Sequence, residues 1–393
     1  MKIKLHLTWI AFCLALISGC ATPPPPTIKA PMDLQSAVNN LVADLFGQVR
    51  ANQSFISRIG KKSFVLDPFI DAHSAEVNET SLQIEKILTR QVKTAFPDFN
   101  VDSMSAKTLA SAQYVVNGII RLDRSSGNGF YRVTSSVVDM KTGIVIANAE
   151  VMLTKENIQY EPVGPYKDSP MFLKDKRTEG YIATALSKIG DTSDKSYFDT
   201  LPTSAVLSEA DKIFDAGDFN QALSLYQQAE GRQDGKVMKS YSALYQCYLK
   251  LGQLKEAEDV FARLLEVGLK NSNLSTRFMF TVNSTDFIAD AGLRGQYALW
   301  LRQIAKRVGS AGLCLNVSGH SSHTGNERYN DQLSLQRALA VQKIMQKDFP
   351  LALQKTRAYG RGFRENIVGS GSDDAQDAID RRVVFDVVDC SNL

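Results

Sequence analysis

A glycine, a small residue, an aromatic residue and an apolar residue follow one another at fixed spacing, and the same series returns 35 positions later. The first series is Gly217, Ala222, Tyr226 and Ala229, and the second is Gly252, Ala257, Phe261 and Leu264. Such a period is typical of stacked helical hairpins, in which small residues let helices approach and an aromatic ring fills the gap between hairpins. Residues 205–270 are therefore predicted to form two helical hairpins.

This pattern resembles the tetratricopeptide repeat, whose period is about 34 residues. Two hairpins are marginally stable alone, because each buries its apolar face only against its neighbours. The flanking segments must therefore cap them. The resemblance implies a groove that binds an envelope protein partner, but two repeats make only a shallow groove, and a structural spacer is an equally good interpretation.

The first twenty residues are predicted to be an export signal. Lys2 and Lys4 precede an apolar stretch, residues 5–17, that is too short to be a permanent membrane helix. The stretch ends in Leu16-Ile17-Ser18-Gly19-Cys20, which resembles the lipobox of bacterial lipoproteins. The resemblance implies removal of residues 1–19 and covalent lipid, such as palmitate, on Cys20. The alternative is an ordinary secretory signal with a chance cysteine.

The residue after Cys20 is alanine, not the aspartate that signals retention in the inner membrane, so the lipoprotein resemblance implies an outer-membrane anchor. Several acyl chains would hold the protein stably there. Residues 20–32 include four consecutive prolines and are predicted to be an extended tether. At about 3.1 Å per residue it would reach roughly 30 to 40 Å from the membrane into the periplasm.

Length and charge limit the remaining possibilities. A chain of 393 residues exceeds one ordinary core, so several domains are expected. The net charge is +3, of which Lys2 and Lys4 supply two. A nearly neutral mature chain without a long basic run does not predict binding to nucleic acid.

Residues 33–160 are predicted to form an α+β domain, followed by a linker. Periodicity predicts helices over residues 34–49 and 84–95, and strands over residues 63–69, 114–122, 131–140 and 144–153. Residues 161–204 are rich in turn-forming residues, including Pro162, Gly164, Pro165 and Pro170. They are predicted to be a linker with one short helix near residues 179–189.

Three segments of this domain resemble the FlgO, CsgG and LpoB group of envelope lipoproteins. They are Val65-Leu66-Asp67-Pro68-Phe69-Ile70-Asp71, Ala112-Gln113-Tyr114-Val115-Val116-Asn117-Gly118 and Val138-Asp139-Met140-Lys141-Thr142-Gly143. Members of the group serve flagellar rings, curli secretion and peptidoglycan synthases. The resemblance therefore implies a fold and a compartment, but no particular task.

Residues 274–393 are predicted to form a third folded part with a βαβαββ order. Their motifs resemble the C-terminal domain of OmpA, a family that binds diaminopimelate-containing peptidoglycan non-covalently. The matching residues are Gly319, His320, Gly325, Asn330, Leu333, Ser334, Arg337 and Ala338, followed by Asp380-Arg381-Arg382-Val383. The whole chain is thus expected to be an α+β multidomain protein.

The ligand defines which charges the site needs. The free end of diaminopimelate carries an ammonium and a carboxylate, so it requires an anion and a cation. A guanidinium binds carboxylate oxygens in pairs, and the resemblance assigns this role to Arg337. Where the family has aspartate this chain has Ser322, so we expect weaker binding, recognition of another stem peptide, or an anion from elsewhere. Asp286 is the first candidate for that anion.

The other motif residues have weaker assignments. The resemblance places His320 and Asn330 in the ligand loop, whereas Arg381 is expected to brace the last strand or to contact the ligand. His320 and His323 without a third nearby ligand do not predict a metal site. No nucleophile elbow, histidine cluster or phosphate-binding glycine loop is present, so we expect neither an enzyme nor a cofactor beyond the lipid on Cys20.

The family fold implies that Cys314 and Cys390 form a disulfide, because it places the two strand ends side by side in a compartment that permits such bonds. Cys247 lies in a helical pattern and is predicted to be a buried, inert thiol. The leading interpretation is an outer-membrane lipoprotein that binds peptidoglycan and links it to partner proteins. The alternative is a regulatory or assembly factor that activates a peptidoglycan synthase or an envelope secretion or flagellar machine.

Overall fold

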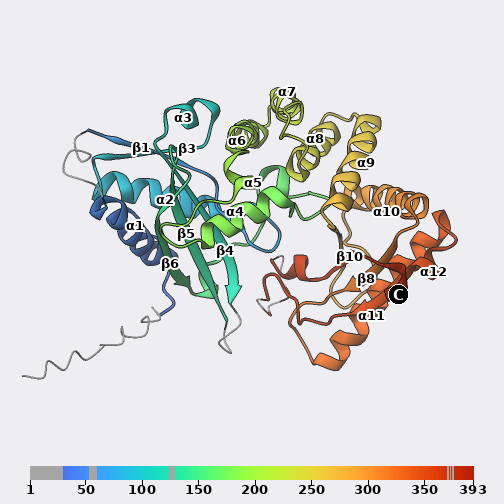
Figure 1. Cartoon of the computed structure of the whole chain (residues 1–393). Coiled ribbons are helices and arrows are strands. Elements are labelled where there is room, and N and C mark those ends of the chain that lie inside the picture. The colour runs from blue at the N-terminus through green and yellow to red at the C-terminus, as the bar shows by residue number, and fades with distance from the viewer. Residues whose placement is uncertain (1–29, 53–59, 124–128, 370, 372, 374–375) are drawn as a thin grey trace, which may run out of the picture. The chain divides into compact units, whose positions relative to one another are not determined.

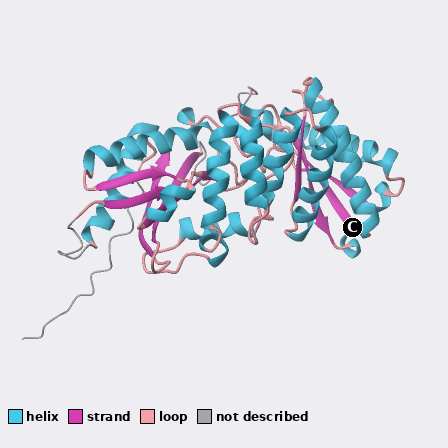
Figure 2. Cartoon of the chain, turned by 90° about the horizontal axis from the view of Figure 1, so that it is seen from above, coloured by secondary structure: helices cyan, strands magenta, loops and turns pink. Residues whose placement is uncertain are grey.

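The computed structural model of the protein describes residues 30–52, 60–123, 129–369, 371, 373 and 376–393. The predicted signal peptide, the lipidation site Cys20 and most of the predicted tether lie outside these residues. Residues Pro31–Leu393 form one compact unit, whose strands belong to two separate sheets (Figures 1 and 2). Within the described ranges, no helix combines the length and the apolar character that crossing a membrane requires.

The first sheet forms the amino-terminal domain. Its described strands are β1 (Lys62–Leu66), β2 (Ile70–Asp71), β3 (Phe99–Ser103), β4 (Tyr114–Asp123), β5 (Phe130–Asp139) and β6 (Val145–Leu153). The order is β3-β1-β4-β5-β6, with β2 paired to β4. β1 runs parallel to β3 and β4, whereas β4, β5 and β6 are antiparallel. The three long strands agree with the sequence prediction; the short β3 and the helix α3 (Ala106–Ser111) were not predicted.

Alternate residues of β4 face two different layers, as the two-residue period of a strand requires. Val116 and Ile120 join the apolar cluster of α1 (Leu34–Ala51) and α2 (Glu79–Ala95). Val115 and Ile119 join the cluster that includes α4 (Lys176–Leu186) on the opposite face. The sheet is therefore buried on both faces.

Residues 161–204, predicted to be a linker, are packed against this sheet instead. They contain the short helices η3 (Gly164–Tyr166) and α5 (Lys195–Phe198) as well as α4. The Tyr181 hydroxyl accepts a hydrogen bond from the Gly118 N–H at 2.9 Å and donates to the Pro68 carbonyl at 2.8 Å. Gly164 and Pro165 begin the short helix η3. Tyr166, Tyr181 and Tyr197, on η3, α4 and α5, are buried, so turn composition alone overestimated the freedom of this segment.

Two helical hairpins follow, as the repeat predicted. They consist of α6 (Leu201–Asp215) with α7 (Phe219–Glu230), and α8 (Met238–Lys250) with α9 (Leu254–Lys270). Tyr226 and Phe261, the paired aromatic residues, are fully buried. Cys247 on α8 is also fully buried, and burial raises the pKa of its thiol to about 12.

The second sheet forms the carboxy-terminal domain. The elements run β7 (Leu274–Met279), α10 (Ala291–Ala311), β8 (Cys314–Gly319), α11 (Glu327–Asp348), α12 (Ala352–Lys355), β9 (Thr356–Gly360), η4 (Gln376–Asp380), β10 (Arg382–Val388) and η5 (Cys390–Asn392). Sheet order is β7-β10-β8-β9. Apart from short helical turns, this is the predicted βαβαββ order.

The carboxy-terminal domain supplies the cap that two hairpins need. Trp300 on α10 donates a hydrogen bond from its indole Nε1 to the Tyr245 hydroxyl at 2.8 Å. Its ring also lies against that of Phe261, with 6.1 Å between centroids. The first helix of one domain thus covers the open apolar face of the last hairpin.

A buried ion pair joins β7 to the loop between β2 and α2 of the amino-terminal domain. Arg277 on β7 contacts both carboxylate oxygens of Glu76, at 3.0 and 3.1 Å. The same guanidinium donates to the carbonyls of Tyr166 and Ser169, at 3.1 and 2.8 Å. Both charged side chains are at least 95% buried, so each depends on the partners that the other segments supply.

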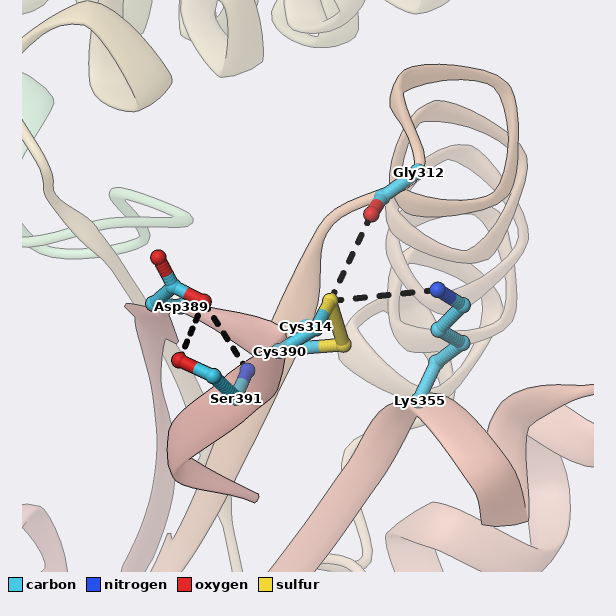
Figure 3. The surroundings of a disulfide bond; sticks show 6 residues. All are labelled: Gly312, Cys314, Lys355, Asp389, Cys390 and Ser391. Atoms are coloured by element: carbon cyan, nitrogen blue, oxygen red, sulfur yellow. Dashed lines mark hydrogen bonds between the residues drawn. A yellow bond between two sulfur atoms is a disulfide. The ribbon is translucent and has the colours of Figure 1, made fainter.

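Cys314 and Cys390 form a disulfide with a Cα–Cα distance of 5.1 Å, as predicted (Figure 3). Antiparallel pairing of β8 and β10 places Val388 opposite Cys314, which brings the two cysteines together. The ammonium of Lys355 lies 3.8 Å from the Cys390 sulfur (Figure 3).

The disulfide closes a loop with a sequence separation of 76 residues. Replacing both cysteines by serine is expected to lower the free energy of unfolding by about 4 kcal/mol, because the unfolded chain regains the entropy of that loop. Urea unfolding of the oxidised protein and the double variant measures the difference. Equal free-thiol counts before and after reduction would rule the bond out.

The Glu76 carboxyl is expected to make stability depend on pH. Burial raises its pKa to about 7 although Arg277 opposes the shift, whereas in the unfolded chain it titrates near 4.3. The folded state therefore binds more protons between these values, so the free energy of unfolding falls as the pH rises through this window. Glu76→Gln lacks this contribution. The melting temperature of the wild type relative to the variant should drop from pH 5 to 7.5; a constant difference contradicts the prediction.

Candidate functional site

The loop after β8 is shaped by its close approach to α11. A Cβ atom at Gly319 would lie 1.9 Å from the Ser334 carbonyl oxygen, so only glycine fits there. Asn330 on α11 donates from its amide nitrogen to the carbonyls of Thr324 and Asn326, at 2.6 and 3.2 Å. Asn330 therefore fixes the course of the loop.

Arg337 is fully buried beneath this loop. Its three nitrogens donate to the carbonyls of Ser284, His320 and Thr281 at 2.9 to 3.0 Å. Burial lowers its pKa to about 10, so the guanidinium remains charged at neutral pH. This arrangement differs from the predicted ligand-facing guanidinium, because the charge is already shared among three backbone carbonyls.

His320 is buried with its ring nitrogens unpaired among the described residues. Burial, aided by the charge of Arg382, lowers the pKa of His320, which keeps the imidazole neutral at pH 7. Its Nδ1 lies 3.7 Å from a Glu365 carboxylate oxygen. The side chain faces the protein interior, and its backbone supplies the carbonyl that Arg337 binds.

Ser322 and Thr324 converge on a carboxylate that the motif did not indicate. The Ser322 hydroxyl donates to one oxygen of Asp373, and the Thr324 hydroxyl donates to the other at 2.6 Å. Arg381 donates to the same carboxylate at 3.3 Å. Asp373 thus places a carboxylate beside Ser322. From the sequence, such an anion was expected from another part of the chain.

The surroundings of Asp373 keep it ionised. Burial raises its pKa, but the hydrogen bonds from Ser322 and Thr324 and the charge of Arg381 outweigh this effect, so the pKa of Asp373 is lowered. The carboxylate is 22% exposed. An additional cation can therefore reach it.

Buried carboxylates hold the loop that carries Asp373, which lies between β9 and η4. Asp380 accepts from the N–H groups of Ile367, Val368 and Gly369 at 2.6 to 3.2 Å. Asp377 accepts from the Asp373 N–H at 2.9 Å. Asp373 has a positive φ of 56°, an unfavourable conformation for a residue with a side chain, so this support is needed.

Asp373 and Arg381 open into a cavity of about 520 Å³. Its lining includes Met279, Ile288, Asp290 and Leu293 from the carboxy-terminal domain and Tyr160, Glu161, Pro162 and Lys167 from the amino-terminal part. The Arg381 side chain is 7% exposed and is oriented by a hydrogen bond from Nε to the Phe280 carbonyl at 3.3 Å. Asp373 and Arg381 thus meet in one cavity with apolar side chains and with further charged ones, Glu161, Lys167, Asp168, Arg277 and Asp290.

The predicted site residues therefore separate into three groups. Ser322 and Arg381 meet at Asp373, whereas Arg337, His320 and Asn330 support the surrounding loops. Asp286 lies in an exposed turn, where it accepts a hydrogen bond from the Ser284 hydroxyl at 3.0 Å, and it does not line the cavity. Asp373 was missed because it lies 51 residues after Ser322. The only signal for it was the absence of an acid at Ser322 itself.

Within the part of the chain that the structure describes, no group of three or more His, Cys, Asp or Glu side chains is placed to hold a metal ion. At the cavity, Asp373, Arg381 and the apolar side chains beside them can contact a ligand by charge and by shape.

Comparisons with known proteins match two parts of the chain. Among solved structures, a peptidoglycan-associated lipoprotein from Burkholderia pseudomallei is 22% identical, with a TM-score of 0.24; the match covers 28% of this chain and 89% of that one. The LpoB C-terminal domain from Salmonella enterica is 13% identical, with a TM-score of 0.23, and the match covers 31% of this chain and 99% of that one.

No curated protein matches the chain. Residues 214–275 match the tetratricopeptide repeat family, and residues 291–380 match the OmpA family. The chain thus carries a tetratricopeptide repeat followed by an OmpA-family domain.

Proposed function

We propose that the chain binds the peptidoglycan stem peptide non-covalently through its carboxy-terminal domain, at Asp373 and Arg381. The observation that carries this proposal is the pairing of an ionised carboxylate and a guanidinium at a 520 Å³ cavity in an OmpA-family domain. The free end of diaminopimelate carries the complementary ammonium and carboxylate. No bond needs to form or break, so the role is one of binding rather than catalysis.

Asp373 is suited to the ammonium. Two hydroxyl donors hold its oxygens in place, and its lowered pKa keeps the charge present at neutral pH. A charge-assisted hydrogen bond to such a carboxylate is about twice as strong as a neutral one. Asp373 would thus do what an aspartate at position 322 does in the family.

Arg381 is suited to the carboxylate. Its Nε and Nη1 hydrogen bonds fix the plane of the guanidinium at the cavity wall, and a fixed plane favours paired binding of carboxylate oxygens. Arg337 would act indirectly, because its bonds to His320, Thr281 and Ser284 hold the loop after β8 against the loop after β7.

The location follows from the sequence rather than from the described residues. Lipid on Cys20 would anchor the chain in the outer membrane, and residues 20–32 would let the folded part reach the cell wall. The disulfide agrees with an oxidising compartment. The amino-terminal domain and the hairpins would then connect this anchor to partner proteins.

Asp373→Asn tests the ligand site directly. Loss of the charge is expected to weaken binding of the full chain to purified diaminopimelate-type sacculi by roughly 10- to 150-fold, as loss of one charge-assisted bond implies. Cosedimentation at increasing sacculus concentration measures the affinity. Asp286→Asn is the matched control and should bind like wild type; equal affinity of both variants would refute the assignment of Asp373.

Moving the negative charge from position 373 to position 322 extends the same test. Ser322→Asp alone should weaken binding, because two carboxylates would then compete for one site. Combining Ser322→Asp with Asp373→Asn returns one negative charge and should recover most of the affinity; a double variant no better than Asp373→Asn contradicts the proposed exchange.

Arg337→Met is expected to act on stability rather than on contact with the ligand. Three backbone carbonyls would lose a charged donor, which should cost more than about 3 kcal/mol of unfolding free energy. Urea unfolding measures this cost. Arg328→Met, an exposed change on the same helix, is the control and should cost less than about 0.5 kcal/mol. Comparable losses in the two variants would be incompatible with a structural role for Arg337.

A further inference from the structure

The loop that carries Asp373 is held by two domains. Its own domain contributes the Asp377 and Asp380 carboxylates. On the other side, the Tyr131 hydroxyl on β5 donates to the Val368 carbonyl at 3.0 Å. Lys155, which follows β6, donates from Nζ to the Gly369 carbonyl at 3.4 Å.

Apolar contacts join the same loop to the amino-terminal domain. Ile367 and Val368 are each 3% exposed and belong to the apolar cluster that contains α1, α2 and one face of the first sheet. Ile379 and Val384 of the carboxy-terminal domain belong to this cluster as well. The loop is therefore part of the core of the neighbouring domain, although it lies more than 200 residues away along the chain.

The amino-terminal part also forms one wall of the cavity. Tyr160 and Pro162 line it opposite Asp373 and Arg381, and the ring of Tyr160 lies 5.8 Å from that of Tyr131. Tyr131, which binds the loop, and Tyr160, which lines the cavity, are thus neighbours. A ligand in the cavity would touch both domains.

We propose that the amino-terminal domain is part of the peptidoglycan site, with Tyr131 and Lys155 as positioning residues for Asp373. This inference rests on the function proposed above and extends it from one domain to two. Because coupling free energies are reciprocal, a bound stem peptide must in turn stabilise the docking of the amino-terminal domain on the loop. A partner that binds this domain would thereby sense whether the chain holds the cell wall.

The backbone of Asp373 explains why such positioning is needed. A positive φ at a residue with a side chain persists only where its surroundings impose it. Releasing the Val368 carbonyl would let the loop populate other conformations, in which the carboxylate no longer faces Arg381. The apparent affinity then falls in proportion to the population of the competent conformation.

Tyr131→Phe in the full chain tests the proposal, with a soluble diaminopimelate-containing muropeptide as the probe. Isothermal titration calorimetry should give a dissociation constant raised about fivefold, the effect of one ordinary hydrogen bond. Tyr114→Phe is the matched control, because the same hydroxyl is removed at the far end of the neighbouring strand, where Tyr114 pairs with Asp139. This control should bind like wild type, and Lys155→Met should weaken binding like Tyr131→Phe.

Hydrogen exchange provides a readout that a merely structural tyrosine would not change. On addition of the muropeptide, amides of residues 129–133 and 155–160 should exchange more slowly in wild type, and the protection should be smaller in Tyr131→Phe. If wild type does not bind the muropeptide, the proposed function itself fails. If wild type binds but Tyr131→Phe matches Tyr114→Phe in affinity and protection, the proposed function stands and the two-domain site is refuted.

Discussion

The guanidinium of Arg277 lies where three parts of the chain meet, and its buried charge takes its acceptors from the two other parts. Glu76 supplies a carboxylate from the amino-terminal domain, while Tyr166 and Ser169 supply carbonyls from the segment after it. Leaving such a charge without partners would cost several kcal/mol. The first strand of the carboxy-terminal domain, β7, is therefore held against the amino-terminal domain, and residues of both domains line the cavity at Asp373. A ligand bound in this cavity would therefore contact both domains.

The site shows how one electrostatic requirement can be met from a different place in the sequence. Ser322 brings no charge, yet its hydroxyl binds the carboxylate of Asp373, which stands beside it in space. The replacement is not equivalent to an aspartate at position 322, because Asp373 belongs to a loop whose shape depends on Asp377, on Asp380 and on the neighbouring domain. The anion is thereby connected to structure far outside the OmpA-family region.

Local sequence patterns predicted the helices and strands well, but they predicted the tertiary contacts between them less well. The 35-residue repeat identified the hairpins, and strand order implied the Cys314–Cys390 bond, because these features depend on periodicity and on a shared fold. The packing of residues 161–204 was not predictable from their turn residues, since burial of Tyr181 is decided by distant Gly118 and Pro68. Arg337 was expected to face the ligand because a motif specifies a residue type, whereas the carbonyls that enclose it come from other loops.

The buried thiol of Cys247 has a practical consequence for following this molecule. It has no exposed surface, and its raised pKa leaves almost no thiolate at neutral pH, the form that reacts with electrophiles. Within residues 30–393 the other two cysteines are bonded to each other. A fluorophore or spin label attached to a cysteine introduced on the surface would therefore report from one known position. The rate at which Cys247 itself is modified would measure how often the hairpins open.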